Sequence, residues 1–221
     1  MIIGYSSKGY PEQRNIIGIL PDADYVYIYD IYKLILFATK VYNKAIQNHP
    51  VFGTNDLLFS FHDLNLNNVD VMHFFNTISF SKTPWITTFE TIIPRCNSIL
   101  SIDHSQNCSF ESLKDDKKIF KALDALSSNS CKKLIAMSEC NLYMQKDFLQ
   151  HFPQYRAEIE NKLLHIHPPQ ELFVNSYDSK ELPLNGQIHF MFVGGLFFSK
   201  GGMEILEAFS ESIKNNKYPI K

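Results

Sequence analysis

The sequence predicts an α/β fold in which parallel strands are connected by crossover helices. Apolar runs typical of buried strands alternate with stretches in which apolar residues recur at helical spacing. The chain has 221 residues, of which 45% are hydrophobic and 20% are charged, a balance typical of a folded protein with a sizeable core. This composition excludes a disordered, a collagen-like or a coiled-coil chain.

The first predicted elements lie near the N-terminus. Residues 25–29, Tyr-Val-Tyr-Ile-Tyr, are rich in strand-forming side chains. Apolar residues then recur every three or four positions over 31–46, which predicts an amphipathic helix that ends near His49-Pro50. We expect the apolar stripe of this helix to face the core. The stripe consists of Ile31, Leu34, Ile35, Ala38, Val41, Tyr42, Ala45 and Ile46.

Three further strands are predicted at 57–61, 69–75 and 85–89. Turn-forming residues bound each of them, and the connections are short. Because strands joined by short connections are usually adjacent, we expect these three to be neighbours in one sheet.

The next elements again alternate between helix and strand. A helix is predicted over 115–125 and a strand over 132–137. A second helix is predicted to begin near Ser138-Glu139, with Ser138 as its N-cap. A further strand is predicted over 163–167.

The C-terminal part is predicted to start a second domain. A polar, turn-rich stretch between Pro168 and Gly186 predicts a linker, so the expected domains are 1–183 and 184–221. The second domain begins with an apolar strand over 187–193 and ends with an amphipathic helix over 203–213. A single strand and helix cannot bury their apolar faces by themselves, which predicts that this domain is incomplete.

Charge and cysteine content limit the partners and the compartment. Twenty-one Lys and Arg against 23 Asp and Glu give a net charge of -2, which argues against a nucleic-acid partner. Four cysteines at spacings that fit no zinc motif are expected to be reduced thiols in a cytoplasmic protein. No stretch approaches the roughly 18 apolar residues of a membrane span, although peripheral contact with the inner face of a membrane is compatible with the sequence.

The strongest chemical signal is the loop over 194–202, which holds four glycines and Lys200 between a predicted strand and a predicted helix. Glycines let backbone N–H groups approach a phosphate, while the helix N-terminus and the lysine add positive charge. The spacing matches neither the P-loop nor the dinucleotide motif, so a small NTPase is the weakest hypothesis. The loop therefore predicts a general phosphate-binding turn, with a plain left-handed turn as the alternative.

The segment from Phe192 to Phe209, FVGGLFFSKGGMEILEAF, resembles the start of the second domain in nucleotide-sugar-dependent glycosyltransferases of the GT-B type, which have two Rossmann-like domains. More narrowly, it is similar to the large retaining family four, which reads roughly F-V-G-R-L-x-x-x-K-G-x-x-x-L-x-E-A-F there. Upstream segments agree in order and spacing, so the resemblance covers about residues 69 to 213. These segments are Val69–Asn76, Thr83–Glu90, Leu134–Glu139 and His167–Pro169.

This resemblance implies a Rossmann-like, acceptor-side N-terminal domain and the start of a C-terminal domain that binds the donor. The implied activity is the transfer of a sugar, with retention, from a UDP- or GDP-sugar to a hydroxyl of a glycan or lipid-linked acceptor. It implies no metal and no separate cofactor, with catalysis at the carboxyl ends of the strands. The family also has two glutamates eight positions apart, and no two of the eleven Glu here have that spacing, which implies a missing C-terminal segment.

In the donor site, Lys200 falls on the family's lysine that neutralises the departing diphosphate. Gly195 stands where the family usually has an arginine. Gly194 and Gly201 complete the expected donor-phosphate site.

In the acceptor half, Glu90 falls on the family's catalytic position, which is usually a histidine. The alternative is that the Glu90 carboxylate caps the following turn at Thr91. Arg95, Ser138 and Glu139 are the acceptor-side candidates, with a structural role as the alternative for Arg95.

Two further patterns in the sequence are weaker, and one rival hypothesis differs in class. His165 and His167 should share one face of a strand, as metal ligands can, but no third ligand is evident. Asp103, His104 and Cys108 include a candidate base and nucleophile, yet no catalytic motif surrounds them and a surface loop is expected. The rival is a non-catalytic fragment that binds an acceptor or a partner and exposes apolar surface on its last strand and helix.

Overall fold

The structure is a computed structural model with two compact units, Met1–Gln170 and Glu171–Lys221. It describes residues 1–46, 55–96, 99, 110–169, 175–176, 178 and 190–215.

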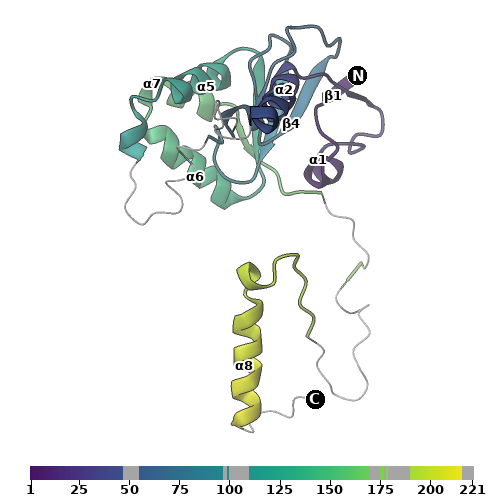
Figure 1. Ribbon diagram of the computed structural model, residues 1–221, viewed down its shortest axis with the longest axis vertical. Helices are drawn as coiled ribbons and strands as arrows, with labels where there is room; N and C mark the ends of the chain where they lie inside the picture. Colours follow the sequence, from purple (N-terminus) through teal and green to yellow (C-terminus); the bar gives the residue numbers. More distant parts are fainter. Residues whose placement is uncertain are drawn as a thin grey trace. The chain divides into compact units, whose positions relative to one another are not determined.

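The first unit is built on a six-stranded parallel sheet flanked by helices, which confirms the predicted α/β class (Figure 1). The strand order is β2-β1-β4-β6-β7-β8. The strands are β1 (Ile2–Tyr5), β2 (Asp24–Tyr27), β4 (Val71–Phe75), β6 (Trp85–Phe89), β7 (Cys131–Ala136) and β8 (Leu163–His165).

Helices and a second, two-stranded sheet surround this sheet. The described helices of the first unit are α1 (Tyr10–Asn15), α2 (Ile31–Ile46), α3 (Asn55–Leu58), the 3-10 helix η1 (Phe110–Leu113), α5 (Lys117–Ser127), α6 (Glu139–Gln150) and α7 (Pro153–Glu160). The second sheet pairs β3 (Ser60–Phe61) with β5 (Ile78–Ser79) in parallel.

The strand order identifies the edge of the sheet where a ligand is expected. From β1 the chain adds β2 on one side, and then β4, β6, β7 and β8 follow on the other side. The order therefore changes direction between β1 and β4. In open parallel sheets, ligands bind beyond the carboxyl ends of the strands near such a switch point.

One predicted strand is wrong. Residues 57–61 were expected to join the main sheet, but Leu57 and Leu58 end α3, and only Ser60 and Phe61 form a strand. That strand pairs with β5, through bonds from the N–H of Ile78 to the carbonyl of Phe59 (2.9 Å) and from the N–H of Phe80 to that of Phe61 (2.9 Å). The other two strands of this group, β4 and β6, are neighbours as predicted.

The orientation of α2 corrects a second prediction. Its bounds are as expected, but most of the apolar stripe predicted to face the core is exposed. Leu36, which lies outside that stripe, is the buried apolar side chain of the helix. The exposed members of the predicted stripe are Leu34, Ile35, Ala38, Val41, Tyr42 and Ala45.

The rotation of α2 is fixed by contacts at its first turn. The N–H of Ile31 donates to the carbonyl of His62 (2.8 Å), and the Asp30 carboxylate accepts from the N–H groups of Tyr32 (3.0 Å) and His62 (3.3 Å). The Tyr32 ring then packs edge-on against Phe80, with 6.4 Å between ring centroids. These contacts turn the side of the helix that carries Tyr32 and Leu36 toward the fold.

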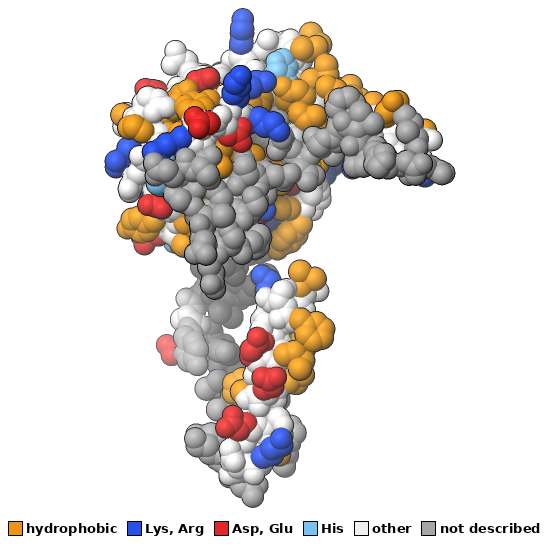
Figure 2. Space-filling view, turned by 60° about the vertical axis from the view of Figure 1, so that its left-hand side comes forward, with side chains coloured by type: hydrophobic (Ala, Val, Ile, Leu, Met, Phe, Trp, Pro, Cys, Tyr) orange, Lys and Arg blue, Asp and Glu red, His pale blue; other side chains and the backbone are white. Residues whose placement is uncertain are grey.

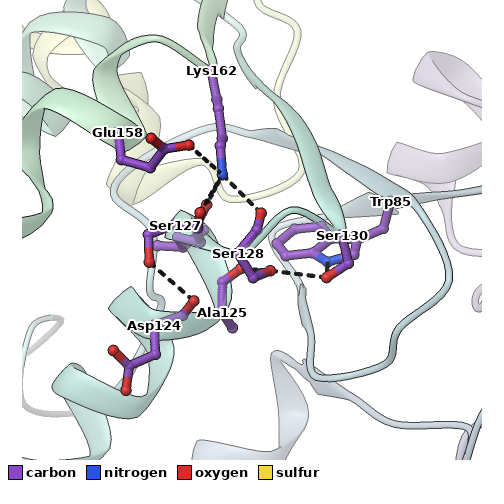
Figure 3. Close-up of polar contacts among 9 residues, drawn as sticks. Trp85, Asp124, Ala125, Ser127, Ser128, Ser130, Glu158 and Lys162 are labelled. Atoms are coloured by element: carbon purple, nitrogen blue, oxygen red, sulfur yellow. Dashed lines mark hydrogen bonds and ion pairs between the residues drawn. The ribbon is translucent and has the colours of Figure 1, made fainter.

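The buried Lys162 side chain caps the C-terminal end of α5 (Figure 3). Lys162 Nζ donates to the carbonyls of Leu126 (3.1 Å), Ser127 (2.6 Å) and Ser128 (2.8 Å), and its Nζ lies 3.4 Å from Glu158 Oε1. The last carbonyls of a helix have no partner within the helix, and a cation placed there also interacts favourably with the helix dipole.

The same region holds the single tryptophan of the chain. The Ser128 hydroxyl donates to the carbonyl of Ala125 (2.7 Å) and lies 2.9 Å from the Ser130 hydroxyl, which accepts from Trp85 Nε1 at 3.3 Å. The indole of Trp85, which is fully buried, therefore reports on the end of α5.

Protonation of His73 is expected to make stability depend on pH. The ring lies on β4 with Nε2 2.9 Å from Thr88 Oγ1, and burial lowers its pKa from the ordinary 6.5 to about 4. Between these values the unfolded chain binds a proton that the native chain does not, so stability falls as pH decreases through this window. Between pH 7 and pH 4.5, we expect the titration of His73 to lower the free energy of unfolding by about 2 to 3 kcal/mol, as measured by urea unfolding.

The matched control is His73→Gln, which cannot titrate in this range. We expect its stability to change less than that of the parent chain between pH 7 and pH 4.5. An equal loss in both proteins would assign the pH dependence to other groups.

The second unit contains η3 (Phe198–Lys200) and α8 (Gly202–Lys214), the helix predicted over 203–213. The predicted strand over 187–193 is not found in its described part, since residues 190–193 have no strand structure. A strand needs a neighbour to satisfy its backbone hydrogen bonds, and the described part of this unit provides none.

The described part of the second unit exposes apolar surface, as the fragment hypothesis predicted. Figure 2 shows hydrophobic side chains along one side of α8 and acidic side chains along another. The large apolar side chains exposed in the described part of this unit are Phe190, Met191, Val193, Leu196, Phe197, Phe198, Met203, Ile205, Leu206 and Ile213.

Candidate functional site

A polar network lies at the carboxyl ends of β4 and β6. Asn76 follows β4, and Glu90 follows β6. The Asn76 side chain donates to Glu90 Oε1 (3.1 Å) and accepts from the backbone N–H of Glu90 (3.1 Å). Asn76 is buried and has a φ of 55°, a left-handed conformation that asparagine tolerates better than most residues. The double contact fixes the position of Glu90 at the edge of the sheet.

Arg95 completes an ion pair with Glu90. Its guanidinium Nη1 donates to Glu90 Oε1 at 2.8 Å, and its Cζ lies 4.9 Å from the centroid of the Phe59 ring. Its buried Nε has no hydrogen-bond partner among the described residues. The Glu90 carboxylate thus pairs with Arg95 and Asn76, and the structure gives no support to the alternative that it caps the turn at Thr91.

The network continues to the first turn of α6. Ser138 is the N-cap, as predicted: its hydroxyl accepts from the N–H of Asn141 (3.1 Å). It also donates to Asn141 Oδ1 (2.8 Å), and Asn141 Nδ2 donates to the carbonyl of Glu90 (2.5 Å). Glu139 is exposed on the same turn, and no described hydrogen bond joins it to the network. The structure therefore brings together Glu90, Arg95 and Ser138, but leaves out Glu139.

A cavity of about 450 Å³ lies beside this network, with Arg95 in its wall. It is lined by residues of α2, α3, β3, β5, the 94–96 loop and the first turns of α5, and most of its lining is apolar. Lys118 and Lys121 add two further cations, and Lys121 Nζ lies 4.9 Å from the centroid of the Phe80 ring. None of the described residues that line the cavity is acidic.

The glycine-rich loop of the second unit forms a tight turn. Gly201 has a φ of 79°, the left-handed conformation that glycine adopts most readily. The N–H groups of Lys200, Gly201 and Gly202 donate to the carbonyls of Leu196 (3.1 Å), Phe198 (3.3 Å) and Phe197 (2.9 Å). Those three donors are therefore already bonded within the loop, which leaves the exposed Lys200 side chain as the positive group that this turn presents.

The other glycines of this loop lie in different environments. A Cβ on Gly194 would lie 3.4 Å from Lys200 Cγ, whereas a Cβ on Gly195 would meet no atom within 4 Å. A Cβ on Gly202 would lie 2.5 Å from the Phe197 ring, so this glycine is required for close packing. Gly194, Lys200 and Gly201 thus lie close together, whereas the space beside the Gly195 Cα is open.

Two asparagines and two lysines of this region were not predicted from the sequence. Asn76 and Asn141 hold Glu90, and Lys118 and Lys121 line the cavity. The available signal for Asn76 was its place directly after a predicted strand, at the edge where parallel sheets bind ligands.

Neither of the weaker patterns gains a function from the structure. The rings of His165 and His167 lie 4.4 Å apart, as expected for one face, but the described residues contain no group of three metal-ligating side chains. Asp103, His104 and Cys108 lie outside the described residues. Within the described ranges, every helix is too short or too polar to cross a membrane.

Comparison of the chain with protein-family models, with curated proteins and with solved structures finds no match.

Proposed function

We propose that this chain forms at least part of a glycosyltransferase, which moves a sugar from a nucleotide sugar to a hydroxyl acceptor with retention. The first unit binds the acceptor at the carboxyl edge of its sheet, and the 194–202 loop faces the phosphates of the donor. The observation that carries the proposal is the Glu90–Arg95 pair, fixed by Asn76 at the strand ends of a six-stranded parallel sheet.

Glu90 is suited to orient a hydroxyl of the acceptor. Its Oε1 is used by Arg95 and Asn76, and no described hydrogen bond reaches its Oε2. The side chain is 45% exposed, so Oε2 is accessible to a ligand. Arg95 and Asn76 hold the other carboxylate oxygen in place, and a carboxylate oxygen can accept a hydrogen bond from a hydroxyl.

Lys200 is suited to neutralise the diphosphate as it leaves. When the bond between the sugar and the diphosphate breaks, negative charge develops on the diphosphate. Fixed cations such as the Lys200 ammonium group contribute most at this step. The donor is a UDP- or GDP-sugar, and the acceptor is a glycan or a lipid-linked glycan at the cytoplasmic face of a membrane or in the cytoplasm.

The second candidate function is a non-catalytic fragment that binds an acceptor or a partner. The exposed apolar residues of the described part of the second unit favour it, because such surface is normally covered in a complete domain. The two candidates differ in whether the protein made by its source cell releases a nucleotide from a sugar donor.

Glu90→Gln is expected to lower the rate of sugar transfer by about 100-fold, within the range for removal of a group that accepts a proton or a hydrogen bond in the reaction. The measurement uses the native protein from the cells that make it, a panel of UDP- and GDP-sugars with glycan and lipid-linked acceptors, and nucleotide release as the signal. Donor affinity should change little, because Glu90 lies in the acceptor half.

The matched control is Glu139→Gln, an exposed glutamate outside the network, which should leave the rate within a factor of two. Equal rates for Glu90→Gln and the parent would remove Glu90 from the reaction. No nucleotide release with any donor would favour the fragment.

A further inference from the structure

The cavity beside Arg95 has a chemical character that the proposed function does not use. Its walls are formed largely by apolar side chains from α2, α3, β5 and α5. Its volume of about 450 Å³ is within the range of pockets that enclose small organic ligands. An apolar pocket of this size favours a ligand that buries an aliphatic or aromatic body.

Three cations line the same cavity. Arg95 comes from the loop after β6, and Lys118 and Lys121 lie three residues apart on α5. Glu90 offsets the charge of Arg95 at Nη1, but the buried Nε of Arg95 has no partner among the described residues. None of the described lining residues is acidic, so the charged groups among them are all positive, and apolar walls strengthen the attraction of such groups for an anion.

Two of these cations are held against aromatic rings of the wall. Arg95 lies over Phe59 and Lys121 over Phe80, each at 4.9 Å from the ring centroid. Such contacts favour a defined position of a cation and of its apolar stem. The positive groups and the apolar surface are therefore parts of one built pocket.

We propose that this cavity binds an amphipathic anion, in which a carboxylate or phosphate group is attached to an aliphatic or aromatic body. The anionic group lies toward Arg95 and Lys121, and the apolar body packs against Ile35, Leu57 and Ile78. The inference concerns equilibrium binding by the first unit and does not rest on the glycosyltransferase proposal.

The test is isothermal titration of the 221-residue chain with three probes. Decanoate has both parts of the ligand, decan-1-ol has only the apolar body, and inorganic phosphate has only the anion. We expect one decanoate per chain, bound at least tenfold more tightly than either of the other two. Equal affinity for decanoate and decan-1-ol, or no binding of decanoate, would overturn the proposal.

Variants of α5 test the role of charge. Lys121→Met keeps the apolar stem near Phe80 and removes the cation, and it should weaken decanoate binding about fivefold to tenfold while decan-1-ol binding is unchanged. Lys117→Met is the matched control, since Lys117 is exposed on the same helix and does not line the cavity. An equal effect of both substitutions would show only a general charge effect and would contradict the proposed site.

Variants of α2 test the location. Ile35 lines the cavity and is 44% exposed, so Ile35→Trp fills its mouth without disturbing the core and should weaken decanoate binding. Leu34→Trp, at a neighbouring position that is 68% exposed and does not line the cavity, should leave binding unchanged. If Ile35→Trp binds decanoate as the parent does, the ligand is elsewhere. None of these outcomes alters the sugar-transfer measurement.

Discussion

Replacing Lys162 by methionine is expected to lower the free energy of unfolding by about 3 kcal/mol. Hydrogen bonds to a charged group each contribute about 1.5 to 3 kcal/mol, and the loss is greater where buried partners are left unsatisfied. Lys162 Nζ donates to three carbonyls at the end of α5, and its side chain is only 11% exposed. Methionine fills much of the same volume but donates nothing, so these carbonyls lose their partner.

Urea unfolding followed by Trp85 fluorescence measures this loss, because the indole is bonded to Ser130 just beyond the same helix end. Lys132→Met is the control: Lys132 is exposed on β7, and its replacement should change stability by less than about 0.5 kcal/mol. A loss of that small size for Lys162→Met would mean that water replaces the ammonium group without cost.

Three central strands of the sheet could be predicted closely from the sequence. Trp85–Phe89 has the predicted bounds, and the strands predicted over 69–75 and 132–137 are found with small shifts. Each contains a run of apolar, aromatic or β-branched residues between turn-forming residues, and this composition identifies it as a strand. The four-residue strand β1 was missed, because Gly4 and the short run of Met1-Ile2-Ile3 resemble a loop as much as a strand.

Contacts between distant segments could not be predicted from local patterns. The apolar stripe of α2 predicted the helix. Which of its sides faces the fold is decided by two hydrogen bonds with the backbone of His62: the N–H of Ile31 donates to its carbonyl, and Asp30 accepts from its N–H. The helix α7 was missed although Pro153 stands in its first turn, where proline is common.

In the candidate site, too, residues close in sequence could be predicted and contacts between distant segments could not. Glu90 and Arg95 are five residues apart, and the sequence placed both at the expected edge of the sheet. Asn76 and Asn141 reach Glu90 across 14 and 51 residues, so their contacts depend on the strand order β4-β6-β7. That order is a property of the folded sheet and is not encoded in any local spacing.

Under the proposed function, Lys200→Ala is expected to lower the rate of sugar transfer by about 100- to 1000-fold, the effect of removing one group that stabilises developing charge in an active site. The reason is specific to this loop. The N–H groups of Lys200, Gly201 and Gly202 are already bonded to carbonyls of the loop, so they are not free to bind a phosphate, and the lysine side chain supplies a full positive charge at this turn. Nucleotide release by the native protein, compared with that of the variant, measures the effect.

A second substitution makes this prediction sharper. Gly195 stands where the glycosyltransferase motif that this loop resembles has an arginine. A Cβ there would meet no atom within 4 Å, and the φ of Gly195 is not in the left-handed region. Gly195→Arg should therefore be tolerated. Added to Lys200→Ala, it should raise the rate at least tenfold, because its guanidinium replaces the missing cation beside the same turn. Lys214→Ala, at the far end of α8, should have no effect on the rate. If Lys200→Ala transfers sugar as fast as the parent, the loop is a plain turn and the donor phosphates are bound elsewhere.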